Sequence, residues 1–219
     1  MAQIAEDLLL LLLDNASNRP ALDRDRREKM LAAAVLLDLA LACRIRPALD
    51  NEPAAPGRLV LLTGPDLADP ILDPAIRRLQ GRPMKPQAAV AKVRRGVEPA
   101  LLGQLEQGGF IRPIQLRGNK SPRVWTMQDR SRVDRARSAL LGALFELRNP
   151  APTTAAIISL LHAADGLGAL LSLNERGWQW VDSRAADIAA GCWVDETTAE
   201  GLSQVNLAVM ASALEPALR

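Results

Sequence analysis

The sequence has few of the residue types that build metal, redox and catalytic sites. Among 219 residues it contains one histidine, two cysteines, two phenylalanines, four tryptophans and no tyrosine. Cys43, Cys192 and His162 stand far apart, so the chain has no metal-ligand spacing and no nucleophile with an identifiable base. We therefore expect no enzyme, no metal and no cofactor. The cysteines are expected to be free buried thiols, and the histidine to be a packing residue of the core.

Long apolar segments of the kind that cross membranes are also missing. The longest leucine run, Leu8 to Leu13, is bracketed by Glu6, Asp7 and Asp14. Such a run is far shorter than the roughly 20 apolar residues that a membrane span requires. The start of the chain also lacks the pattern of a signal peptide. We expect this run to be a core helix, or at most an interfacial helix, of a cytoplasmic protein.

Aliphatic residues make up most of what is present, and they are concentrated in one stretch. The chain is 48% hydrophobic and 24% charged, which is typical of a globular protein. Residues 30 to 46 (MLAAAVLLDLALACRIR) are apolar on nearly every side, as in a helix at the centre of a domain. This pattern predicts a central hydrophobic helix over about Asp25 to Cys43. The one carboxylate in its apolar part, Asp38, is expected to pair with an arginine or to cap a neighbouring helix.

The remaining elements are predicted mainly as helices around this one, which gives a mainly α fold in a single domain over residues 1–219. One or two small β-hairpins are expected. The clearest is formed by Phe110–Leu116 with Arg123–Met127, and a further one is plausible between Cys43 and Thr63. Apolar periodicity and capping residues predict further helices. These are Ile4–Leu13, Asp73–Gln80, Gln87–Arg95, Val97–Gln107, Arg130–Leu147, a helix ending near Ala164, Glu175–Ala190 and Ala199–Leu214.

The small net charge of +2 conceals a strong asymmetry along the chain. From Arg77 to Arg137 there are fifteen basic residues against four acidic ones, whereas three basic residues face eight acidic ones after Arg148. A basic middle segment suggests a face that meets polyanions such as membrane head groups or nucleic acid. A solvated surface that uses arginine for solubility is the alternative.

The segment from Gln87 to Met127 has the element order of a winged helix: two helices and then a hairpin. Its expected recognition helix, Val97–Gln107, carries Glu98 and Glu106 but no arginine or lysine. Reading base edges or binding phosphates requires such donors. Nucleic acid is therefore an unlikely partner, and a winged-helix-like binder is kept only as an alternative.

Several segments resemble the Golgi phosphoprotein 3 family, a class also found in actinobacteria. They occur in the same order as in that family and together span about 90% of the chain. The segment VLLDLALACRI resembles the family's central helix and IAEDLLLLLLD its opening helix. The others are DPILDPAIRRL, LLGQLEQGGFI before the hairpin, and LLHAADGLGALL.

The resemblance implies a helical, non-enzymatic peripheral membrane protein. Eukaryotic members of the family bind phosphatidylinositol 4-phosphate and act as adaptors that sort Golgi enzymes. Their pocket uses one tryptophan and three arginines, and these four positions fall on Asp23, Ala32, Arg95 and Glu98 of this chain. Only Arg95 keeps the family's residue type. The two acids and the lost cations weaken a phosphate site, so less specific binding to anionic lipid is expected.

Two groups of residues are predicted to meet the anionic phospholipids. Lys92, Arg94 and Arg95 are the expected head-group ligands, at about 1 kcal/mol for each cation near a charged bilayer. The hairpin is expected to contact the membrane through Arg117, Lys120, Arg123 and Trp125. Trp125 would be an interfacial anchor or an ordinary packing residue of the hairpin. The resemblance also implies possible protein clients and oligomerisation through the hairpin, and a protein–protein adaptor using the same basic face is the alternative.

Overall fold

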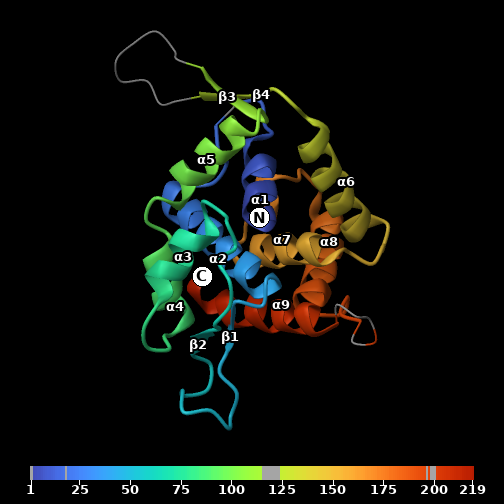
Figure 1. The fold of residues 1–219 in the computed structure, drawn as a ribbon. Coiled ribbons are helices and arrows are strands. Elements are labelled where there is room, and N and C mark those ends of the chain that lie inside the picture. The colour runs from blue at the N-terminus through green and yellow to red at the C-terminus, as the bar shows by residue number, and fades with distance from the viewer. Residues whose placement is uncertain (1, 18, 115–123, 196, 198–200) are drawn as a thin grey trace.

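Helix α2 (Arg24–Leu41) runs through the middle of the molecule, and other helices surround it (Figure 1). The computed structural model describes residues 2–17, 19–114, 124–195, 197 and 201–219. Every residue of α2 from Met30 to Ala40 is buried, which confirms the predicted central hydrophobic helix. The helix begins where Asp23 accepts a hydrogen bond from the backbone N–H of Arg26 (2.9 Å), so the local sequence supplies its N-cap.

Around α2, the fold is mainly helical with two small antiparallel hairpins, as the sequence predicts. Helices α1, α3, α4, α5, α7 and α9 all pack against α2. The first half of the chain contributes α1 (Gln3–Leu13), β1 (Ile45–Pro47), β2 (Leu59–Leu61), α3 (Leu72–Leu79), α4 (Pro86–Val93) and α5 (Val97–Gln107). The second half contributes β3 (Ile111–Ile114), β4 (Val124–Met127), α6 (Ser131–Phe145), α7 (Pro152–Ala163), α8 (Glu175–Ala189) and α9 (Gly201–Leu214).

Helix α1 is buried from Ile4 to Leu13, and its N-terminus rests on Asp38 of α2. The six leucines from Leu8 to Leu13 are at most 1% exposed. Asp38 accepts hydrogen bonds from the backbone N–H groups of Ile4 (2.9 Å) and Ala5 (3.0 Å). These are among the first N–H groups of a helix, which have no partner within it. The structure thus confirms one of the two predicted roles of Asp38, the capping of a neighbouring helix.

Helix α6 is fastened to α1 by arginines that reach buried carboxylates. Arg132 binds Asp7 through Nε (2.6 Å) and Glu6 through a terminal nitrogen (2.5 Å). Its guanidinium also lies over the ring of Phe110, with 5.3 Å from Cζ to the ring centroid. Because Phe110 directly precedes β3, Arg132 links the base of the second hairpin to the core.

Two predictions about single residues were wrong. Cys43 and Cys192 are free thiols, but both are exposed. Helix α2 ends at Leu41, and Cys43 adopts φ = +52° in the turn beyond it, so its side chain leaves the apolar stretch. His162 is 27% exposed and lies 3.3 Å from a carboxylate oxygen of Asp182, so it is a surface residue of α7 beside α8.

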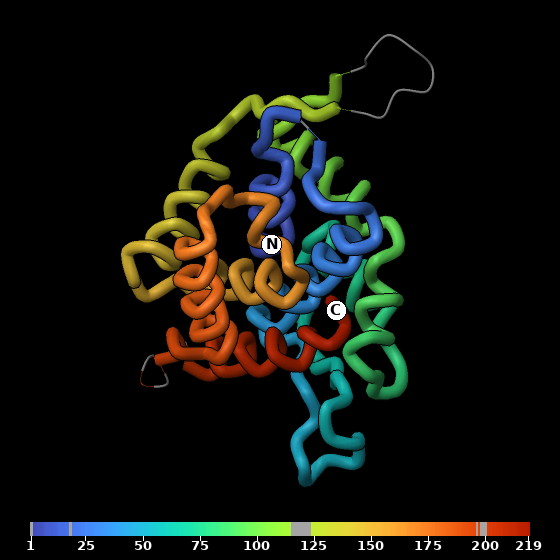
Figure 2. Tube along the Cα trace, turned by 180° about the vertical axis from the view of Figure 1, so that it is seen from behind, coloured from blue at the N-terminus to red at the C-terminus, as the bar shows by residue number. Residues whose placement is uncertain are grey.

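The helices that follow the first hairpin and those of the second half of the chain lie on different sides of the molecule. Helices α3, α4 and α5 run along one edge, whereas α6 and α8 form the opposite edge (Figure 1). The view from behind shows the same separation, with the second hairpin at the end where α5 and α6 approach each other (Figure 2). A surface on α3 and α4 therefore faces away from one on α6 and α8.

Candidate functional site

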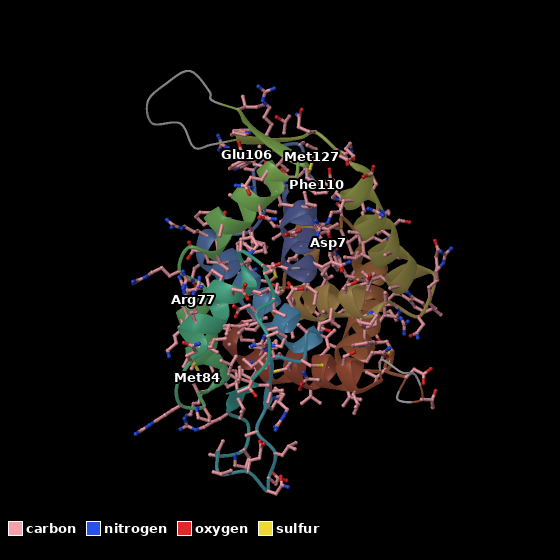
Figure 3. All side chains as sticks on the ribbon, in the orientation of Figure 1. Asp7, Arg77, Met84, Glu106, Phe110 and Met127 are labelled. Carbon is pink, nitrogen blue, oxygen red and sulfur yellow. The ribbon has the colours of Figure 1, made fainter. Side chains whose placement is uncertain are left out.

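The pair of helices α3 and α4 carries a cluster of exposed cations. No acidic residue occurs between positions 74 and 97, whereas seven basic residues do. Six of the seven are exposed, and Figure 3 shows Arg77 at the outer edge of α3. We call these six residues the basic face: Arg77, Arg78, Arg82, Lys85, Lys92 and Arg95.

Amphipathic patterning turns these cations outward. In α3 the buried positions are Leu72, Ala75, Ile76 and Leu79, which leaves Arg77 and its neighbour on the solvent side. In α4 the buried positions are Pro86, Ala89, Val90 and Val93, so Lys92 points to solvent. Gly81 adopts φ = +113° in the connection between the two helices, a conformation that residues with a Cβ rarely adopt.

The cations of the basic face are not neutralised by carboxylates. Within the part of the chain that the structure describes, none of the six forms an ion pair. Arg78 donates hydrogen bonds to the carbonyl oxygens of Val93 (3.1 Å) and Arg95 (2.8 Å) at the C-terminal end of α4. Carbonyl groups carry no net charge, so Arg78 secures α4 and still contributes its positive charge to the surface.

The three predicted head-group ligands have different environments. Lys92 and Arg95 are exposed members of the basic face. Arg94 instead turns toward α2, where it lies 2.9 Å from a carboxylate oxygen of Asp25 and 3.3 Å from one of Glu28. Two carboxylates thus share the charge of Arg94, and the side chain attaches α4 to α2.

The structure describes only some of the residues of the second hairpin that are predicted to contact the membrane. Strands β3 and β4 pair from Ile111 with Met127 to Ile114 with Val124, which confirms the predicted hairpin. Arg117, Lys120 and Arg123 lie outside the described residues. Trp125 is only 6% exposed and belongs to the hydrophobic core, so in this structure it is a packing residue.

A groove that the sequence did not reveal lies beside the basic face, between α5, the start of α2 and the loop before α2. Its volume is about 520 Å³, which lies within the usual range for small-molecule sites. Three arginines and three glutamates line it together with apolar residues. The groove is lined by Arg19, Pro20, Arg24, Arg27, Glu28, Glu98, Pro99, Leu102, Gly103, Glu106 and Trp125.

Most of the charges in the groove are already paired. Arg27 binds Glu98 at 3.1 Å, and both side chains are nearly buried. Arg24 binds Glu28 at 2.7 Å and is largely exposed. Neither Arg19, from the loop before α2, nor Glu106, from α5, forms an ion pair with any other residue that the structure describes. The sequence did not point to these residues because four separate segments supply the lining.

The comparison with protein families decides the classification. The model of the family Golgi phosphoprotein 3 (GPP34) matches residues 4–205. The chain belongs to this family. A comparison with curated proteins found no match. Among the residues described, no helix combines the length and the apolar character that crossing a bilayer would require.

Family membership directs attention to the four positions that correspond to the pocket of the eukaryotic GPP34 members. Asp23 caps α2, and Ala32 is fully buried in the middle of that helix. Glu98 forms an ion pair with Arg27, and Arg95 is exposed on the basic face. These four positions therefore do not form a cluster of cations here. The exposed cations near them are Lys92 and Arg95, and those beside the groove are Arg19 and Arg24.

Proposed function

We propose that this GPP34 protein docks on anionic phospholipid membranes through the basic face and serves there as an adaptor. The observation that carries the proposal is the set of six exposed cations on α3, α4 and the turns beside them, none of which forms an ion pair with a described carboxylate. Each cation contributes about 1 kcal/mol near a charged bilayer, so six supply up to about 6 kcal/mol of attraction. That energy suits reversible docking, which corresponds to dissociation constants from millimolar to micromolar.

The mixed lining of the groove supports binding to anionic lipids in general over selection of one phosphoinositide. A phosphomonoester head group would meet Glu28, Glu98 and Glu106 in the groove, and these repel it. The basic face has no such acids. Its cations can meet phosphatidylglycerol, cardiolipin or a phosphoinositide with similar energy, because the attraction depends on charge density.

The side of the molecule away from the basic face supports the adaptor role. Phe145, Leu147 and Trp180 are between 39% and 56% exposed at the junction of α6 and α8. Exposed aromatic and apolar side chains are typical of the central part of protein interfaces. When α3 and α4 lie on a membrane, this junction faces the aqueous phase and is accessible to a protein client (Figure 1).

Nucleic acid remains an alternative partner for the same cations, but one observation disfavours it. Helix α5, which would be the reading helix of a winged-helix protein, carries no arginine or lysine. Its Glu98 is bound to Arg27, and Glu106 is exposed. This helix would bring negative charge into a DNA groove.

Sedimentation with vesicles of matched surface charge tests the proposal. We expect the protein to sediment with vesicles that contain phosphatidylglycerol, cardiolipin or phosphatidylinositol 4-phosphate, to a similar extent for each. Neutral phosphatidylcholine vesicles should leave it in solution, and added salt should weaken binding because exposed charges are screened. Duplex DNA is included as a competitor.

Each other outcome would overturn part of this proposal. Binding to none of the vesicles would remove the membrane function. Binding only to the phosphoinositide would show a selective pocket in place of a general basic face. Efficient displacement by duplex DNA at low concentration would favour the nucleic-acid alternative.

A further inference from the structure

The groove beside α5 has a balanced set of charges, which restricts the ligands that it can accept. Three arginines and three glutamates line it, so its formal charge is zero. A purely anionic ligand would be repelled by the carboxylates and a purely cationic one by the guanidinium groups. The complementary ligand is itself neutral overall and carries one charge of each sign.

Two side chains of the groove are available to hold these opposite charges. Arg19 comes from the loop before α2, and Glu106 comes from the last turn of α5. Both are exposed and have no ion-pair partner among the described residues. Figure 3 shows Glu106 at the end of α5 that lies next to the second hairpin. The loop before α2 and helix α5 therefore offer one cation and one anion to the groove.

Neighbouring groups refine the chemistry of each charge. Arg24 begins α2, directly after the loop that carries Arg19, and its ion pair with Glu28 leaves it largely exposed, so two guanidinium groups can meet a phosphate. Trp125 lines the groove together with Glu106, and an indole attracts an ammonium group. A carboxylate accepts hydrogen bonds from a primary ammonium, which a trimethylated ammonium cannot donate.

We propose that the groove binds a zwitterionic phosphodiester that carries a phosphoethanolamine group, with its phosphate on Arg19 and Arg24 and its ammonium on Glu106. This inference concerns a site separate from the basic face and goes beyond the proposed docking. A failure of vesicle binding through the basic face would leave it intact. The same head group occurs in a bilayer lipid and in a soluble metabolite, and the test separates the two.

The first measurement is calorimetric titration of the full chain with glycerophosphoethanolamine, glycerophosphocholine and inorganic phosphate. We expect saturable binding of glycerophosphoethanolamine and weaker binding of the other two. Glu106→Gln removes the partner of the ammonium and should weaken glycerophosphoethanolamine binding about tenfold, the usual effect of losing one charged hydrogen bond. The same substitution removes a negative charge and should strengthen the binding of inorganic phosphate. A merely structural defect would weaken both.

One further variant blocks the groove, and another is a control on the opposite side of the molecule. A Cβ at Gly103 would meet no atom within 4 Å, so Gly103→Met places a side chain in the groove without disturbing the packing of α5. It should abolish glycerophosphoethanolamine binding. Glu175→Gln changes an exposed glutamate in the first turn of α8, on the opposite side of the molecule, and should change nothing.

The source of the head group is then decided with vesicles. Phosphatidylglycerol vesicles with and without phosphatidylethanolamine are compared for the unaltered protein and for Gly103→Met. Stronger binding in the presence of phosphatidylethanolamine, lost in Gly103→Met, identifies a lipid ligand. If the protein binds both kinds of vesicle equally and still binds the soluble compound saturably, the ligand is a metabolite. Absence of saturable glycerophosphoethanolamine binding, or binding unchanged by both Glu106→Gln and Gly103→Met, would overturn the proposal.

Discussion

Replacing Arg132 by alanine is expected to lower the free energy of unfolding by about 3–5 kcal/mol, because it leaves two buried carboxylates without their cation. Arg132 donates to Asp7 at 2.6 Å and to Glu6 at 2.5 Å. The side chain of Glu6 is 4% exposed, so water cannot take the place of the guanidinium. Burial raises the pKa of Asp7 and Arg132 opposes that rise, so the remaining acid would tend to take up a proton.

Urea unfolding followed by circular dichroism measures this effect, with two comparisons. Arg135→Ala removes an exposed arginine from the next turn of α6. Its guanidinium donates to the carbonyl oxygen of Ser131 and acts on Asp7 and Asp129 only at longer range, so this variant should stay within about 0.5 kcal/mol of the unaltered protein. The triple variant Arg132→Ala/Glu6→Gln/Asp7→Asn removes the uncompensated charges and should recover part of the loss. A loss below about 1 kcal/mol for Arg132→Ala would show that α6 does not depend on this contact.

Asp38→Ala is expected to destabilise the fold by about 2–6 kcal/mol. It leaves two buried N–H groups without a hydrogen-bond acceptor, and each such group costs about 1–3 kcal/mol. The N–H groups of Ile4 and Ala5 lie in a fully buried helix start and have Asp38 as their acceptor. Asp187→Ala, an exposed aspartate of α8, is the control and should be nearly neutral. Equal stabilities of the two variants in urea would contradict the capping role.

The same carboxyl group gives the stability a pH dependence of known sign. Burial raises the pKa of Asp38 from 3.8 to about 8, against the opposing effect of the N–H groups of Ile4 and Ala5. Between these two values the folded state binds a proton that the unfolded state has released. The free energy of unfolding should therefore fall as the pH rises from about 4 to about 8. Asp38→Asn should remove this pH dependence. The contribution of Asp7 is the same in the unaltered protein and in Asp38→Asn, so it cancels when their free energies of unfolding are subtracted. If that difference in free energy stayed constant from about pH 4 to about pH 8, it would contradict the raised pKa of Asp38.

The parts of the fold that follow from local pattern could be predicted from the sequence. The apolar stretch of α2, the helical period of α5 and the alternating hairpin β3–β4 each depend on neighbouring residues only. The capping role of Asp38 was foreseen as one of two alternatives, because a buried carboxylate needs a partner. Which helix it would cap depended on the packing of α1 against α2, which no local pattern contains.

The candidate site could be predicted only in part for the same reason. The cations of α3 and α4 were evident from the lack of acids between positions 74 and 97. That Arg94 turns inward to Asp25 and Glu28 depends on how α4 meets α2, across more than 60 residues of sequence. The groove likewise depends on residues from four segments, and its paired charges Arg27 and Glu98 are separated by 71 positions.

A comparison of two charge-reversal variants in the vesicle assay tests the central claim, docking through the basic face, most directly. Lys92→Glu/Arg95→Glu changes two exposed cations of that face and leaves the inward-facing Arg94 intact. Arg135→Glu/Arg176→Glu makes the same change in net charge on the opposite side, on α6 and α8. The first variant should lose at least about 30-fold in affinity for phosphatidylglycerol vesicles, from about 1 kcal/mol for each lost cation. The second should bind nearly as the unaltered protein does, and both should unfold at a similar urea concentration. An equal loss in the two variants would show that only net charge matters, and no loss in the first would contradict docking through α3 and α4.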